Sequence, residues 1–171
     1  TITSLFKLNN YDRKITICLY NSIEELHQDV FGEKREEWEV ALEGEDGILK
    51  LVTPLNSGNV HSYSDIMKIA QKSVADTILE DNFEDIPDWL DITTYLFGLN
   101  DAKTTYSYNN LNIQNVTNFS DAYFITLSLI NIYGINKIIK LYKKAKNYNK
   151  ILNASDNEIN KKIVKYYQEV V

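Results

Sequence analysis

The sequence is poor in residues that cross-link a chain or bind transition metals. Its 171 residues include one cysteine, Cys18, and two histidines, His27 and His61. A single cysteine excludes an intramolecular disulfide and any zinc site built from several thiolates. Two histidines are too few for a His-based metal centre unless carboxylates complete it. His27 is interpreted as a surface or half-buried helix residue, and His61 as a contact near a helix start.

Long apolar runs and an excess of positive charge are also lacking. No apolar stretch is long enough to cross a bilayer, and the N-terminus has no signal-peptide pattern. A net charge of -6 disfavours polyanions. We therefore expect a soluble domain with no membrane span and no nucleic-acid partner. The chain starts at Thr1 rather than Met, which suggests that a leader was removed, with secretion or surface display as one alternative, or that the chain was trimmed.

The overall composition is that of one globular domain over residues 1–171, with 44% hydrophobic and 25% charged residues. The predicted fold class is α+β and predominantly helical. Residues 1–60 are expected to form a small mixed sheet with a helix and a hairpin, and residues 61–171 a helical part. Lysines concentrate between Lys137 and Lys165, which we interpret as solvated helix surface, with an interaction patch as the alternative.

Period-two alternation predicts a strand over residues 14–20, with Ile15, Ile17 and Leu19 on one face. Ser22, followed by Glu25, is typical of a capped helix, here expected to run to about Phe31. Residues 38–43 and 47–52 flank an Asp46–Gly47 turn and are predicted to form a hairpin.

The later sequence is predicted to be helical. A helix capped by Ser62 or Ser64 should run to about Asp81, with an apolar stripe at every fourth residue. Pro87 is expected in the first turn of the next helix, which Gly98 ends. The remaining predicted helices run from Ser120 or Asp121 to an αL Gly134, over residues 135–146, and over 156–167.

Segments in this order resemble the gluzincin metallopeptidases, the superfamily of thermolysin-like and peptidase-MA-like domains. The match is carried by KITICLYNSIEELHQDVFG with EWEVALEGEDGILKLVTP, by SYSDIMKIAQKSVADTILED, by FEDIPDWLDITTYLFG, and by AYFITLSLINIYGINKIIKLYKKAKNY. The second is similar to the helix that normally contains H-E-x-x-H, and the third to the segment P-x-W-L-x-E-G. The last resembles the C-terminal helices that close these domains. The resemblance implies a zincin-like fold over nearly the whole chain.

In this family two His and a Glu bind zinc, and the Glu within H-E-x-x-H handles the proton of the attacking water. The alignment places Lys72 and Asp76 at the two His positions, Ser73 at the general base and Ile92 at the third ligand. Lysine and isoleucine offer no metal-binding lone pair, and Ser cannot act as a carboxylate base. Trp89, Ile92 and Leu96 form an apolar seam instead, so we expect a hydrophobic plug at this point.

The resemblance thus implies a catalytically inactive, peptidase-like domain that keeps a binding or scaffold role, with a protein or peptide partner at the former cleft. No cofactor is expected, and zinc enters only if the alignment is wrong. The first alternative is an active or atypical metallopeptidase with reassigned ligands, such as Asp76 and His61. The second is a structural module of a larger assembly.

Further residues invite functional interpretations beside simpler ones. Tyr123 lies where related enzymes often carry a Tyr near the substrate oxyanion, but a Tyr on an apolar helix usually packs its ring. Lys72 and Ser73 are neighbours on a helix and point in different directions, which disfavours Ser–Lys hydrolysis. Carboxylates gather over residues 80–88 without the pattern of a calcium loop, and are interpreted as a solvated connection into the Pro87 helix. The loop tyrosines Tyr11, Tyr106 and Tyr108 are candidates for a contact surface.

Overall fold

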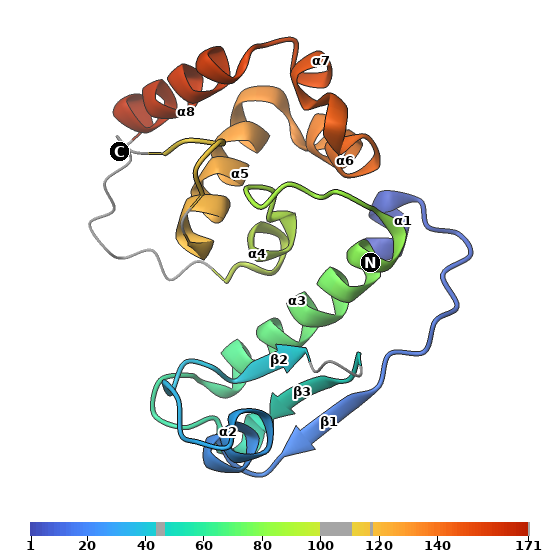
Figure 1. Ribbon diagram of the computed structural model, residues 1–171, viewed down its shortest axis with the longest axis vertical. Helices are drawn as coiled ribbons and strands as arrows, with labels where there is room; N and C mark the ends of the chain where they lie inside the picture. Colours follow the sequence, from blue (N-terminus) through green and yellow to red (C-terminus); the bar gives the residue numbers. More distant parts are fainter. Residues whose placement is uncertain (44–46, 100–110, 117, 171) are drawn as a thin grey trace. The chain divides into compact units, whose positions relative to one another are not determined.

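The computed structural model describes residues 1–43, 47–99, 111–116 and 118–170 (Figure 1). Helices dominate, and a small three-stranded mixed sheet accompanies them, so the protein belongs to the predicted α+β, mainly helical class. Chain contacts separate residues 1–78 from residues 79–171 as two compact units. Each unit is described by itself.

The sheet of the first unit has the strand order β1-β3-β2. Its strands are β1 (Ile17–Tyr20), β2 (Ala41–Glu43) and β3 (Leu49–Val52). β1 pairs with β3 in parallel, and β2 pairs with β3 antiparallel, so the predicted hairpin is confirmed with shorter strands. Gly47 has a left-handed φ of 71°, as a turn residue should, whereas Asp46 lies outside the described residues.

β1 starts three residues later than predicted, at Ile17 rather than Lys14. Ile17 and Leu19 share a face, as the alternation predicts, yet 43% and 61% of their surface remains exposed. The period of two assigns residues to a common face, but only the elements packed on that face decide whether it is buried.

Two helices of the first unit begin at residues that the sequence identified. α2 (Ile23–Phe31) is capped by Ser22, whose hydroxyl accepts the Glu25 amide at 3.2 Å, and Gly32 ends it in the αL conformation. α3 (Tyr63–Asn82) starts after Ser62 rather than Ser64. Ser62 and Asp65 cap each other reciprocally, because each side chain accepts the other's amide, at 3.2 and 2.8 Å.

The core of the first unit joins α2, the sheet and the beginning of α3. Its buried members are Ile23, Val40, Val52 and Ile66, with Ile69 packed against them. On α3 the predicted stripe is buried at Ile66, while its other three members, Ala70, Val74 and Ile78, are half-buried. Two short elements complete this unit: a 3-10 turn, η1 (Pro54–Asn56), that follows the sheet, and an unpredicted N-terminal helix, α1 (Ile2–Phe6), capped by Thr1.

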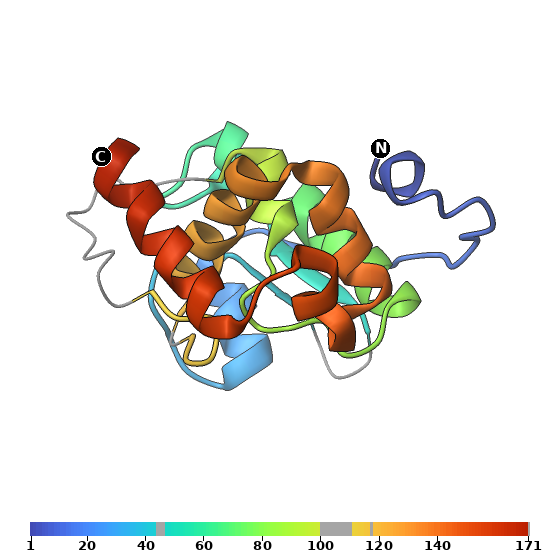
Figure 2. The ribbon, with the colours of Figure 1, turned by 90° about the horizontal axis from the view of Figure 1, so that it is seen from above.

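The second unit is built around one apolar helix, α5 (Phe119–Tyr133), which contacts α4, α6 and α8 (Figures 1 and 2). The other elements are α4 (Ile92–Phe97), α6 (Ile135–Lys143), η3 (Ala145–Asn147), α7 (Tyr148–Leu152) and α8 (Asp156–Val170). Fully buried side chains from α5, α6 and α8 form its core, among them Ile125, Leu129, Ile138, Leu141 and Ile159.

Several predicted helix boundaries in this unit are wrong. No helix begins at Pro87: residues 87–90 form a turn closed by a 2.8 Å bond from the Leu90 amide to the Pro87 carbonyl, and the helix starts only at Ile92. Asn118, not Ser120 or Asp121, caps α5. Gly134 has a positive φ of 83°, but its ψ of 145° is not αL. The predicted helix 135–146 ends at Lys143.

Within the described segments, no single helix combines the length and apolar character needed to cross a membrane. α5 and α6 meet that criterion only when taken together, and they are bent by 119° relative to each other.

Candidate functional site

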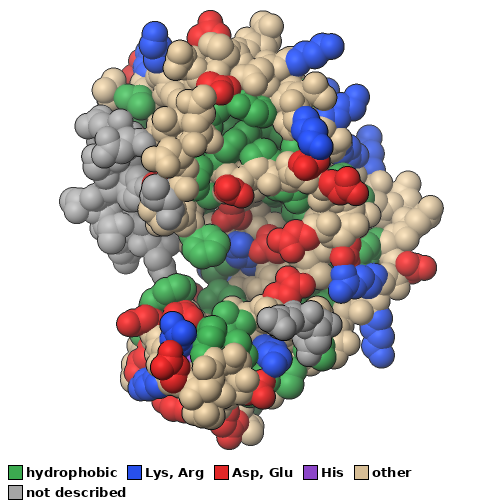
Figure 3. Space-filling view, in the orientation of Figure 1, with side chains coloured by type: hydrophobic (Ala, Val, Ile, Leu, Met, Phe, Trp, Pro, Cys, Tyr) green, Lys and Arg blue, Asp and Glu red, His purple; other side chains and the backbone are tan. Residues whose placement is uncertain are grey.

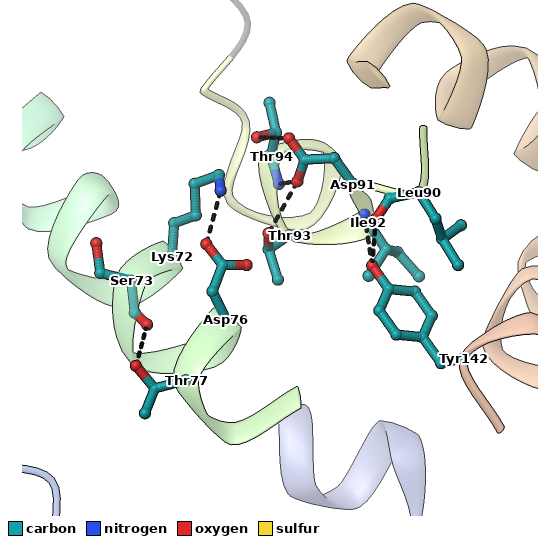
Figure 4. Close-up of polar contacts among 10 residues, drawn as sticks. All are labelled: Lys72, Ser73, Asp76, Thr77, Leu90, Asp91, Ile92, Thr93, Thr94 and Tyr142. Atoms are coloured by element: carbon teal, nitrogen blue, oxygen red, sulfur yellow. Dashed lines mark hydrogen bonds and ion pairs between the residues drawn. The ribbon is translucent and has the colours of Figure 1, made fainter. Parts of the chain in front are cut away.

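The residues aligned with H-E-x-x-H lie on α3, in the first unit. Lys72 and Asp76 stand one turn apart, and the Lys72 ammonium is 2.7 Å from a carboxylate oxygen of Asp76 (Figure 4). The two side chains are 22% and 31% exposed, so the pair is partly shielded from water. Asp76, the one metal-competent side chain among the aligned positions, is therefore engaged by a cation of the same helix.

Ser73 takes part in the helix rather than in a nucleophile–base pair. Its carbonyl accepts a 3.0 Å bond from the Thr77 hydroxyl. Figure 4 shows the Ser73 hydroxyl pointing away from the Lys72 ammonium, which in turn reaches toward Asp76. The geometry agrees with the expectation that adjacent helix residues diverge, and it does not favour Ser–Lys hydrolysis.

Ile92, aligned with the third zinc ligand, lies in the second unit and has no exposed surface. It is the first residue of α4, and its amide donates to the Tyr142 hydroxyl at 3.1 Å. That hydroxyl donates in turn to the Leu90 carbonyl at 3.0 Å (Figure 4). The predicted helical seam with Trp89 is wrong, because Trp89 belongs to the preceding turn. Both side chains are nevertheless buried, with Trp89 4% exposed.

The start of α4 is fixed by a second group of polar contacts. One Asp91 carboxylate oxygen accepts the Thr94 amide at 3.0 Å and the Thr93 hydroxyl at 2.9 Å, and the other accepts the Thr94 hydroxyl at 2.6 Å. The Asp91 amide donates to the Thr126 hydroxyl at 2.9 Å, which donates to the Trp89 carbonyl at 2.9 Å. α5, which carries Thr126, thus holds the turn that places Ile92 in the core.

Tyr123, the candidate oxyanion contact, lies on α5 and is 8% exposed. Its ring packs edge-on against Phe124, with centroids 5.3 Å apart. Burial raises the pKa of its phenol, and the neighbouring Tyr95 and Tyr166 add to that shift. These surroundings are those of a packing residue, as the simpler interpretation has it.

The two histidines serve the backbone of the first unit. His27 is fully buried, which corrects the expectation of a surface or half-buried residue. Its Nδ1 accepts the Arg35 amide at 3.1 Å, so Nε2 carries the proton and donates to the Glu39 carbonyl at 2.8 Å. His61 Nε2 lies 3.2 Å from the Trp38 carbonyl. The described residues hold no group of three or more His, Cys, Asp or Glu side chains that could bind a metal ion.

The acidic stretch 80–88 begins in the last turn of α3 and continues through a connection without regular structure. Asp85 has a left-handed φ of 56° and pairs with Lys146 at 2.6 Å. The expectation that these carboxylates enter the N-terminus of a Pro87 helix is wrong, since that helix does not form. Of the candidate contact tyrosines, Tyr11 is half-buried, and Tyr106 and Tyr108 lie outside the described residues.

No protein-family model, no curated protein and no solved structure matches this chain.

The sequence-based predictions did not include Tyr142 and Thr126, which bind the backbone around Ile92. Nothing in the sequence identifies either, because each acts over more than 30 residues of sequence separation on main-chain atoms. The Asp91 cap did carry a signal. Asp followed by Thr at the third position, D-I-T-T, is typical of a helix start, and it competes with the Pro87 signal four residues earlier.

Proposed function

We propose that this protein is a catalytically inactive, metallopeptidase-like domain that serves as a binding or scaffold module. The observation that carries the proposal is the Lys72–Asp76 ion pair at the position of the zinc-binding histidines. A protonated lysine has no lone pair for a metal, and it stabilises the ionised carboxylate that a metal would otherwise bind.

The other aligned positions support the same proposal. Ile92 brings a hydrocarbon side chain to the position of the third ligand, and its backbone amide is used by Tyr142. The rival enzyme, with Asp76 and His61 as reassigned ligands, would have to release Asp76 from Lys72 and break the contact of His61 with Trp38. Each release has a cost that the binding of a metal would have to exceed.

Metal content and peptidase activity of the purified protein separate the proposal from its rival. We expect substoichiometric zinc and no hydrolysis of a denatured-protein substrate above a buffer control. Stoichiometric zinc, together with hydrolysis that a chelator abolishes and added zinc restores, would establish an enzyme instead.

The resemblance to gluzincins has its own test, the reconstruction of the ligand set. The variant Lys72→His/Asp76→His creates two His at i and i+4, which by themselves bind zinc weakly. Adding Ile92→Glu should tighten zinc binding about 100-fold if position 92 is the third ligand, as measured by competition with a chromogenic chelator. The matched control adds Ile92→Gln, which has nearly the same shape but no charge. Equal zinc affinity in the Glu and Gln variants would contradict the resemblance, and a zinc-dependent rise in the melting temperature of the Glu variant alone would support it.

A further inference from the structure

The segment from α6 to α7 differs in charge from the rest of the chain. Residues 135–152 include six lysines and no aspartate or glutamate, in a protein whose net charge is -6. The segment also has no arginine, since both arginines, Arg13 and Arg35, belong to the first unit. We call the exposed lysines of this segment the lysine surface; its members are Lys140, Lys143, Lys144, Lys146 and Lys150.

The packing of α6 directs these lysines outward. Ile138, Leu141 and Tyr142 are buried on one side of the helix, so Lys140 and Lys143 extend from the opposite side. The segment then bends through η3 and α7, which carry Lys146 and Lys150 on the outside. Figure 3 shows lysine side chains gathered at the surface over this part of the second unit.

The helix dipole accounts for only part of this arrangement. Lys140 and Lys143 lie in the last turn of α6, where a cation is favoured by the C-terminal carbonyls. Lys144, Lys146 and Lys150 follow that helix end and do not share the benefit. Neighbouring like charges weaken a fold slightly, so a lysine surface beyond the helix end needs a different reason.

One member of the surface already holds a carboxylate. Lys146 pairs with Asp85 at 2.6 Å, and the ion pair raises the pKa of that lysine, with a smaller contribution from Glu84. Within the described residues no carboxylate pairs with Lys140, Lys143, Lys144 or Lys150. The surface is therefore built to take carboxylates, and most of its positions have none from this unit.

The chemistry of the surface favours an acidic polypeptide over other polyanions. A membrane-bound helix inserts apolar side chains among its lysines, but none of the large exposed hydrophobic residues in the described chain falls within α6, η3, α7 or α8. Nucleic-acid surfaces rely on arginine and on stacking aromatic rings. Here Tyr133, the ring nearest to α6, already lies beneath the ammonium groups of Lys137 and Lys162, at 5.3 and 4.9 Å from its centroid.

We propose that the lysine surface of α6 and α7 binds an acidic segment of a partner protein, and that Asp85 occupies one position of this site in the free protein. The interaction is one of ammonium groups with carboxylates, so it requires several acidic residues close together and is weakened by salt.

A labelled decaglutamate peptide tests the proposal by fluorescence anisotropy at low ionic strength. The variant Lys140→Gln/Lys144→Gln/Lys150→Gln should bind at least about tenfold more weakly than the unmodified protein, because each exposed charge pair accounts for roughly a two- to fivefold change in affinity. The matched control, Lys7→Gln/Lys14→Gln/Lys34→Gln, removes the same three charges from exposed positions of the first unit and should change affinity less than twofold. Lys→Arg replacement at the three surface positions should retain binding.

Asp85→Asn provides an independent readout, because it removes the carboxylate that occupies Lys146 while Asn still tolerates the left-handed backbone. We expect it to strengthen peptide binding about twofold or more. Equal weakening by the surface and control variants, no strengthening by Asp85→Asn, or no measurable binding would overturn the proposal. Tighter binding to duplex DNA or to phosphatidylserine vesicles than to the peptide would overturn it as well.

Discussion

The hydroxyl of Tyr142 lies between two main-chain groups of one turn, donating to the Leu90 carbonyl at 3.0 Å and accepting the Ile92 amide at 3.1 Å. Both bonds are buried and span about fifty residues of sequence. A single side chain of α6 therefore decides where α4 begins, and with it the position of Ile92.

Removing that hydroxyl should destabilise the protein markedly. Tyr142→Phe keeps the ring and its edge contact with Phe83, but it leaves a buried carbonyl and a buried amide without this partner. We expect a loss of about 2 kcal/mol in the free energy of unfolding, measured by urea denaturation. Tyr63→Phe is the control, since Tyr63 is 57% exposed and the same chemical change there should cost less than about 0.5 kcal/mol. A loss at Tyr142 no larger than that of the control would contradict the role assigned to the hydroxyl.

Thr126 acts on the same turn from α5, so its effect should depend on Tyr142. Thr126→Val preserves shape but removes the hydroxyl that serves the Asp91 amide and the Trp89 carbonyl, and alone it should cost about 2 kcal/mol. The double variant with Tyr142→Phe should lose less than the sum of the single changes, by about 0.5 kcal/mol or more, because the turn released by the first change has little left to lose. Strict additivity in a double-mutant cycle would show that the two hydroxyls act independently.

The Lys72–Asp76 pair should matter little to folding. It is a partly exposed i,i+4 pair in the less favourable order, Lys before Asp, and such pairs contribute a few tenths of a kcal/mol. Lys72→Met should therefore change the free energy of unfolding by less than about 1 kcal/mol. If the same variant acquires zinc, measured by elemental analysis, then the ammonium group is what keeps metal away from Asp76. A large loss of stability would instead show that the pair has a structural role.

Acid should remove part of the stability of the second unit through Asp156. Hydrogen bonds from Asn149, Tyr148 and Gln114 lower the pKa of this carboxyl below its usual value of 3.8. A carboxyl with a lowered folded-state pKa stabilises the fold above the unfolded pKa, and that contribution is lost as the pH falls through the folded value. The advantage of the unmodified protein over Asp156→Asn should be a few tenths of a kcal/mol at pH 6, since the group is largely solvent-accessible, and smaller at pH 2.5.

Urea unfolding of both proteins at the two pH values measures this difference. Asp12→Asn changes the net charge equally at an exposed position and serves as the control. An advantage that stays constant or grows toward pH 2.5 would be opposite to the expected sign.

Local signals in the sequence predicted much of the fold. Ser22 with Glu25, and Ser62 with Asp65, fix the starts of α2 and α3 through bonds that span three residues, and such short-range patterns can be recognised from the sequence alone. Gly98 ends α4 for an equally local reason, its left-handed backbone.

The error at Pro87 shows where local signals end. Proline is suitable both for the first turn of a helix and for a turn, and only contacts from Thr126 and Tyr142 select the second. Those contacts depend on the packing of α5 and α6. The candidate site was predictable as an absence, the missing H-E-x-x-H, whereas the Lys72–Asp76 pairing followed from helix periodicity and the role of Tyr142 did not.

His27 has a consequence for how this protein is cut by proteases. The segment between α2 and β2 has no helix or strand, and one imidazole holds it at two points, the amide of Arg35 and the carbonyl of Glu39. Lys34 and Arg35 would otherwise offer trypsin an accessible site. Because cleavage requires this backbone to enter the protease in an extended form, the nicking rate at Arg35 should report how often the imidazole lets go of the segment, well before the rest of the chain unfolds.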